Sequence, residues 1–375
     1  MLRFIHTSDW QIGMKGGGLG EAGALVSNQR VETIDRVLTA AEQHGARWVL
    51  AAGDLFEDNK VSQDLVDRVA AVLRAHRDVE VHAIPGNHDL PGPGSVWNRA
   101  ALKGVPNLQC HTEPGPVPID AEVTLHPFPV KSRFAGSDPL ASLEDLASQP
   151  GIHIGLAHGH LTSCQFGGHE QDVRLPLDPS HVHRASLDYL ALGHWHGTRV
   201  FPARDGHERI AYSGTHEQTS YAETDAGNVL MVEIDHKGAP PRVQKLRTGV
   251  LSWAREQLAF AGETSTDRLR AVLEGCSADL LLFQLSGELP SELDPDYREL
   301  IESGKRRFKD LRVDDRQLRW RVEDEPSSLP QISDSPLAEV AAQLRARMQS
   351  STGREADVAR EAWRLFRSML QEAGL

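Results

Sequence analysis

The chain has 375 residues, 25% of them charged, and a formal net charge of −13 with histidine counted as neutral. This length predicts a main domain with one or two smaller units, and no apolar run approaches the roughly 20 residues of a membrane helix. The three cysteines form no CxxC pair, and no secretory signal opens the chain, so we expect a protein of the reducing cytoplasm. The negative charge gives no general attraction for nucleic acid, so any contact with DNA must be local.

The first part of the chain alternates between short apolar runs and segments with apolar residues at helical spacing. The runs predict strands and the spaced segments predict helices. The order strand, helix, strand, helix, strand predicts a right-handed parallel unit. The expected strands are 2–7, 47–52, 79–84 and 152–157, and the expected helices are 28–44 and 62–76.

From about residue 107 the pattern changes to closely spaced strand candidates joined by turns, some rich in glycine and proline. A mixed β-sheet sandwich flanked by helices, of the α/β class, accommodates both halves. The expected strands here are 107–111, 122–126, 188–193, 209–213 and 228–235.

After Thr248 the pattern changes again and predicts a small α/β capping domain, followed by a Pro/Ser-rich linker at 324–336 and a helical tail. The expected domains are therefore 1–248, 249–324 and 325–375. Within the capping domain we expect helices at 266–273 and 295–303 and strands at 280–285 and 317–322.

Acidic, amide and imidazole side chains follow the apolar runs of the first 200 residues. The carboxyl ends of strands are where an open α/β sheet places its ligand site. Carboxylate, imidazole and amide oxygen together suit manganese, iron or zinc, and a bridging Asp can hold two such ions for displacement at phosphorus. These candidates are Asp9 and Gln11, Asp54, the Asn87, His88 and Asp89 group, His158 and His160, and His194 and His196.

Three glycines stand close before candidate ligands: Gly53, Gly86 and Gly193. Glycine permits tight turns and unusual backbone angles, so we expect these positions to direct the side chains that follow them toward a common site.

The motifs GD, GNHD and GHWH, in this order, resemble the signature of the calcineurin-like metallophosphoesterases. The N-terminal HTSDW and the later YSGTHE are similar to the SbcD-like branch of DNA repair exonucleases. The matching motifs span roughly residues 1 to 235. This resemblance implies a phosphoesterase with two divalent metal ions, for which we expect manganese, with iron or zinc as alternatives.

Carried over residue by residue, the resemblance implies that Asp9 and His196 bind the first metal and that Asp54 bridges both. Asn87, His158 and His194 would bind the second metal. His88 would be the catalytic acid that protonates the leaving oxygen or steadies the phosphate charge, and Asp89 would orient its ring.

Two positions leave alternatives open. The family usually has His two residues after its first Asp, and here Gln11 offers a neutral and weaker amide ligand, which puts the first metal site in question. In the segment LAHGH, His158 ends the apolar run and is the preferred ligand, but an SbcD-like alignment would select His160.

The first functional hypothesis is a DNA nuclease of repair, exonuclease or endonuclease, that works with an SMC-like coiled-coil ATPase. The second is a phosphodiesterase acting on nucleotides or other small phosphodiesters, which the acidic net charge favours. The third is a non-catalytic scaffold, for which Gln11 is the only indication. The amphipathic tail from Leu337 is typical of packing within the chain or of a homodimer, and a membrane partner is not expected.

Overall fold

The computed structural model describes residues 1–14, 19, 22–134, 136–163, 175–203, 205–321, 336–350 and 354–372. Its contacts divide the chain into two compact units, Met1–Trp253 and Ala254–Leu375. In the part of the chain that is described, no helix combines the length and the apolar character needed to cross a membrane.

The first unit contains two six-stranded sheets, with strand orders β14-β13-β1-β2-β3-β4 and β11-β12-β10-β7-β6-β5. Pairing is parallel from β1 through β4 and antiparallel where β13 joins β1, so the sheets are mixed, as predicted. The strands are β1 (Leu2–Thr7), β2 (Trp48–Ala51), β3 (Glu80–Ala83), β4 (Leu108–Cys110), β5 (Val117–Asp120), β6 (Val123–Phe128), β7 (Ile152–His158), β8 (His160–Leu161), β9 (Pro176–Leu177), β10 (Tyr189–Gly193), β11 (Arg199–Pro202), β12 (Glu208–Tyr212), β13 (Asn228–Ile234) and β14 (Arg242–Arg247).

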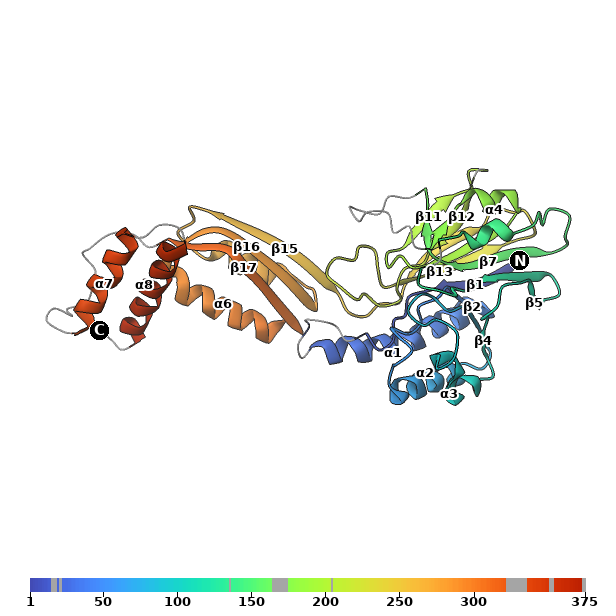
Figure 1. The fold of residues 1–375 in the computed structure, drawn as a ribbon, viewed down its shortest axis with the longest axis horizontal. Coiled ribbons are helices and arrows are strands. Elements are labelled where there is room, and N and C mark those ends of the chain that lie inside the picture. The colour runs from blue at the N-terminus through green and yellow to red at the C-terminus, as the bar shows by residue number, and fades with distance from the viewer. Residues whose placement is uncertain are drawn as a thin grey trace. The chain divides into compact units, whose positions relative to one another are not determined.

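Helices cover the outer faces of this sandwich. Figure 1 shows α1, α2 and α3 together on one side, where apolar residues of α1 and α2 share one core with the strands of the first sheet. A second core fills the space between the sheets, and a third lies between the second sheet and α4. The helices and 3-10 turns are α1 (Ala22–Gln43), α2 (Gln63–Ala75), η1 (Val96–Asn98), α3 (Ala100–Lys103), η2 (Pro139–Ser142) and α4 (Ser180–Arg184).

The local sequence explains why these elements form. Ser62 caps α2 by accepting a hydrogen bond from the backbone N–H of Leu65, and the buried residues of α2 recur at helical spacing. Strands β2 and β7 are buried along their whole length, as expected for short apolar strands covered on both faces. This arrangement brings the carboxyl ends of β1, β2, β3, β7 and β10 toward one edge.

The second unit has a three-stranded sheet in the order β15-β16-β17, and β16 and β17 are parallel. Apolar residues of α5 and α6 share one core with this sheet, and α7 packs against α8 around Trp363. The expected linker residues 324–335 lie outside the described residues. The elements are β15 (Trp253–Ala261), α5 (Asp267–Gly275), β16 (Leu280–Pro290), η3 (Ser291–Leu293), α6 (Asp294–Arg307), β17 (Asp310–Arg321), α7 (Pro336–Ser350) and α8 (Arg354–Glu372).

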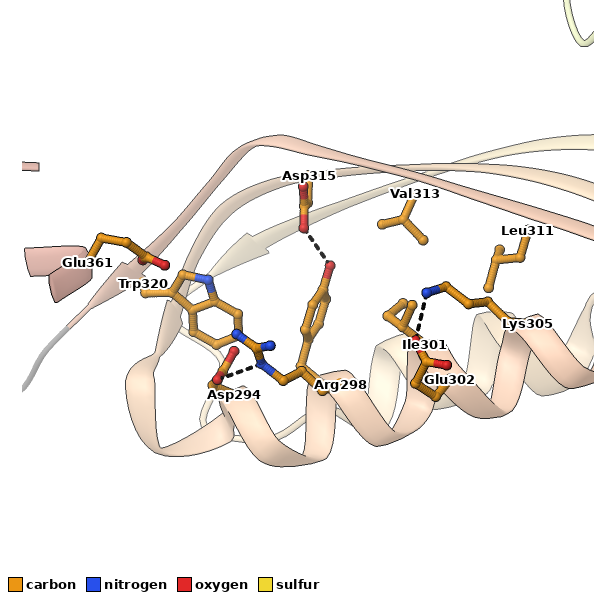
Figure 2. A pocket seen from close by; sticks show the side chains of 11 residues that line it. Asp294, Arg298, Ile301, Glu302, Lys305, Leu311, Val313, Asp315, Trp320 and Glu361 are labelled. Carbon is orange, nitrogen blue, oxygen red and sulfur yellow. Dashed lines mark hydrogen bonds and ion pairs between the residues drawn. The ribbon is translucent and has the colours of Figure 1, made fainter. Parts of the chain in front are cut away.

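A cleft of 610 Å³ lies beside α6 and β17 in this unit (Figure 2). The Tyr297 hydroxyl donates to Asp315 across it, and its two cations, Arg298 and Lys305, are ion-paired with Asp294 and Glu302. Because these charges neutralise one another, the cleft presents no obvious site for a phosphate group. The residues expected to carry chemistry all lie in the first unit.

Candidate metal centre

The turns that follow β1, β2, β7 and β10 bring most of the predicted ligands together. One ligand atom each from Asp9, Asp54 and His158 lies within 4.8 Å of the other two, and all three residues are buried. His160, the alternative to His158, begins β8 and is not part of this group.

Asp54 is at the centre of one half of the site. Nε2 of His158 lies 3.3 Å from Oδ2 of Asp54 and 3.0 Å from Oδ1 of Asn87. The other ring nitrogen of His158, Nδ1, donates to the carbonyl of Ala52 at 2.8 Å, so Nε2 is the nitrogen available to a metal. The ring of His194 packs edge-on against that of His158, with centroids 5.2 Å apart.

Asp9 begins the other half. Nε2 of His196 lies 3.9 Å from Oδ1 of Asp9 and 3.0 Å from the amide nitrogen of Gln11. The backbone N–H of His194 donates to both oxygens of Asp9, at 3.2 and 3.0 Å. The structure therefore brings Asp9, Asp54 and His158 together, and it places the other predicted ligands next to them: Asn87 and His194 against His158, His196 near Asp9, and Gln11 against His196.

The backbone at the site is strained. Asp9, Gln11, Asp54 and His194 have φ angles of 52°, 43°, 53° and 107°, a region that residues other than glycine rarely adopt. Such conformations cost of order 1–3 kcal/mol each and persist where the surroundings hold them, which is common at functional sites.

At two of the three predicted glycines, the reason for glycine is the lack of room for a side chain and not an unusual backbone angle. Gly53 has φ of +86°, as expected. A Cβ on Gly86 would lie 2.1 Å from Oδ1 of Asp54, and one on Gly193 would lie 1.9 Å from the carbonyl oxygen of Ala52. No side chain fits at either position, because the segment after β2 approaches both glycines closely.

Charge coupling within the site is strong. Burial alone would lower the pKa of His158, but Asp54 and Asp9 raise it to about 9. Burial alone would raise the pKa of Asp54, but His158 and His88 hold it below its usual range. Two buried carboxylates set among imidazole and amide groups form a donor set that fits divalent metal ions.

The expectation that Asp89 orients the His88 ring is wrong. Nδ1 of His88 donates instead to the backbone carbonyl of Glu57 at 2.9 Å. Asp89 is buried and its carboxylate accepts hydrogen bonds from three backbone N–H groups, those of Gly86, Leu55 and Phe56. Burial and the neighbouring Asp54 raise the pKa of Asp89 to about 7. Asp89 therefore fastens the turn after β2 to the turn after β3.

The sequence of the first unit decides the family. The profile of the calcineurin-like phosphoesterase family (Metallophos) matches residues 2–198. The chain belongs to this family. It is 24% identical over 247 residues to the uncharacterized metallophosphoesterase YhaO of Bacillus subtilis (strain 168), in an alignment that covers 62% of this chain and 57% of that protein. The chain thus matches little more than half the length of this relative.

Solved structures with a similar fold include TT1561 of Thermus thermophilus, with a TM-score of 0.44 and 11% identity over 66% of this chain and 99% of that one. A dimetal phosphatase from Danio rerio has a TM-score of 0.41 and 13% identity over 64% of this chain and 98% of that one.

The structure also reveals supporting residues that were not among the predicted site residues. Arg30 of α1 is completely buried, and its guanidinium donates to the carbonyls of Asp9, Trp10 and Glu217. Burial lowers the pKa of Arg30 to about 10, which leaves it charged at neutral pH. The Glu217 carboxylate, at the end of the YSGTHE motif, accepts from Thr33 and from two backbone N–H groups after β14. These contacts brace the strained turn that carries Asp9.

Proposed function

We propose that the chain is a two-metal phosphodiesterase that hydrolyses DNA, as a nuclease of DNA repair. The observation that carries the proposal is the position of Asp54: one ligand atom each of Asp54, Asp9 and His158 lies within 4.8 Å of the other two, although Asp9 and His158 are assigned to different ions. A carboxylate shared in this way suits the bridging ligand of two ions about 3.5 to 4 Å apart.

The residues divide between the two ions as follows. Asp9, Gln11 and His196 would hold the first ion, Asn87, His158 and His194 would hold the second, and Asp54 would hold both. When bound, the ions would supply Lewis-acid polarisation of the phosphate and an activated water. Imidazole and carboxylate ligands suit manganese, with iron or zinc as alternatives.

The contacts of His88 support its proposed role as an acid. Its backbone N–H donates to Oδ1 of Asp54 at 2.8 Å, which keeps the residue at the centre, while its Nδ1 is held by the Glu57 carbonyl. Nε2 is thereby left on the side of Asp54, 3.9 Å from Oδ2, where it can donate a proton to a leaving oxygen.

Arg133 supports a phosphate-rich substrate. Among the described residues, two cations have hydrogen bonds to the backbone of candidate ligands, Arg30 to Asp9 and Arg133 to Asn87. Arg30 is completely buried and cannot touch a substrate. Arg133 is exposed, and its Nε donates to the Asn87 carbonyl at 3.0 Å, so the rest of its guanidinium can contact a phosphate beside the second metal.

The SbcD-like motifs further support an SMC-like coiled-coil ATPase as the partner. The cysteine usage supports a cytoplasmic enzyme, the amphipathic tail supports a homodimer, and the changes of pattern along the sequence support a catalytic domain to residue 248 with a capping domain and tail beyond it. The alternative substrate is a nucleotide or another small phosphodiester. The net charge of −13 favours that alternative, because it opposes the approach of a polyanion.

The test is hydrolysis of bis-p-nitrophenyl phosphate and of labelled linear DNA with added manganese, by the wild type and by His88→Ala. Cleavage of both substrates by the wild type and of neither by the variant supports the nuclease. Cleavage of the small diester alone supports the alternative. If the variant binds manganese and cleaves as fast as the wild type, His88 is not the acid; if the wild type binds no manganese, the chain is a scaffold.

A further inference from the structure

We propose that Glu223 is a positioning residue of the first metal site, which fixes the ring of His196 and strengthens it as a ligand opposite the neutral Gln11. This inference rests on the proposed two-metal function.

The two ring nitrogens of His196 face different partners. Nδ1 lies 2.6 Å from Oε1 of Glu223. A carboxylate only accepts hydrogen bonds, so Nδ1 must carry a proton, and whenever the ring is neutral Nε2 presents its lone pair toward Gln11 and Asp9. Glu223 therefore selects the tautomer that can bind a metal.

Glu223 is itself held in place. Its Oε2 accepts from the backbone N–H of Thr219 at 2.7 Å and of Ser220 at 3.3 Å, and Oε1 also contacts the Thr219 hydroxyl. Its side chain is only 10% exposed. A carboxylate with this many fixed donors does not rotate freely, so the orientation of the His196 ring is set before any metal arrives.

His158 and His196 differ in the group that lies behind the ring. On the second half, Nδ1 of His158 donates to the neutral carbonyl of Ala52. On the first half, the acceptor behind His196 carries a full negative charge. A carboxylate behind an imidazole raises its basicity as a ligand, and such partners are worth about 10- to 100-fold in metal affinity. The charged partner thus occurs on the half in which Gln11 is the weaker ligand.

The test is calorimetric titration of the metal-free full chain with Mn²⁺, comparing the wild type, Glu223→Gln and Glu223→Ala. In Glu223→Gln, the amide oxygen can accept from the backbone N–H groups of Thr219 and Ser220 only if the NH₂ group faces Nδ1 of His196. Nδ1 must then accept a hydrogen bond, so the ring proton moves to Nε2, the nitrogen that would bind the metal. We expect two ions in the wild type, a loss of about 10- to 100-fold in affinity at one site in both variants, and little change at the other.

Two further variants sharpen the result. Glu233→Gln removes a carboxylate of β13 that pairs with Arg3 and Arg242, and it should leave both affinities unchanged. Adding Gln11→His to Glu223→Gln supplies a stronger ligand and should restore much of the lost affinity. Thermal unfolding of the metal-free variants checks that they fold.

The outcomes separate this inference from the function on which it rests. If the wild type binds fewer than two ions, the two-metal function fails. If the wild type binds two ions and Glu223→Gln binds both as tightly, or loses both sites equally, the positioning role of Glu223 is wrong while the two-metal function stands.

Discussion

Replacing Gly193 by alanine should damage both the stability of the first unit and its metal site. The added Cβ would lie 1.9 Å from the carbonyl oxygen of Ala52 and 2.9 Å from Nδ1 of His158. Real Cβ atoms essentially never approach closer than 3.0 Å, so a backbone carbonyl or the β10 strand must move by about 1 Å. Overpacking of this kind costs about 1–3 kcal/mol.

The same carbonyl accepts the hydrogen bond that orients His158, and its displacement loses about 1 kcal/mol more. The free energy of unfolding of metal-free Gly193→Ala should therefore fall by about 2–4 kcal/mol in urea titrations, and Mn²⁺ affinity should fall at least about 10-fold. Gly275→Ala is the control, because nothing lies within 4 Å of that Cβ. If Gly193→Ala unfolds within about 0.5 kcal/mol of the wild type, the tight approach of β10 and the turn after β2 is wrong.

Three other perturbations have expected outcomes. Arg133→Ala should raise KM for DNA with little change in kcat, and it should reduce the slope of log DNA affinity against log salt concentration by about 1. The control Arg242→Ala, on β14, should change neither KM nor the slope. Equal effects of the two variants would show that Arg133 does not contact the substrate. Burial first, and the neighbouring histidine second, lower the pKa of His82 and of His126 from 6.5 to about 4. As the pH falls below 6.5, these histidines therefore take up protons more readily in the unfolded chain than in the folded one. The free energy of unfolding, measured in urea, should fall by roughly 2 kcal/mol for each histidine between neutral pH and pH 5. An unchanged free energy of unfolding would contradict their burial as neutral rings. Manganese at about 100 times the dissociation constant of a site should add about 2.7 kcal/mol to the unfolding free energy for each ion bound, and a chelator should reverse the gain; a melting temperature insensitive to both would argue against a folded metal site.

The elements that could be predicted from the sequence are those with a regular apolar or alternating pattern. The strand at Trp48–Ala51 is wholly apolar and the strand at Glu80–Ala83 alternates polar and apolar residues, and both fall within the predicted ranges. The strands at Arg242–Arg247 and Trp253–Ala261 were not predicted. Both have polar or exposed residues at many positions, and β14 is an edge strand, so neither presents an apolar run.

The site was predictable where side chains directly follow strands. Asp9 and Asp54 follow neighbouring strands of one sheet and His158 ends a strand of the other, so the strand order and the packing of the two sheets bring them together. Arg30 and Glu223 could not be found in this way, because their roles depend on residues far away in the sequence. Arg30 contacts Thr215, 185 residues away, and Glu223 contacts His196, 27 residues away. No local pattern distinguishes them from ordinary charged residues of a helix and a loop.

Asp89 shows the opposite error. Its position beside His88 in the sequence predicted contact between the two side chains, but neighbouring residues of a tight turn point in different directions. Its carboxylate reaches the backbone N–H groups of Leu55 and Phe56, and the carbonyl of Glu57 holds the His88 ring. Adjacency in sequence is therefore a weak guide to which groups meet in an irregular segment.

The most direct test of the central claim is anomalous diffraction from crystals of the full chain grown with Mn²⁺. The account predicts two peaks about 3.5 to 4 Å apart, both in contact with Asp54, one beside Asp9 and His196 and the other beside Asn87 and His158. A single peak, or two peaks that do not share Asp54, would contradict it.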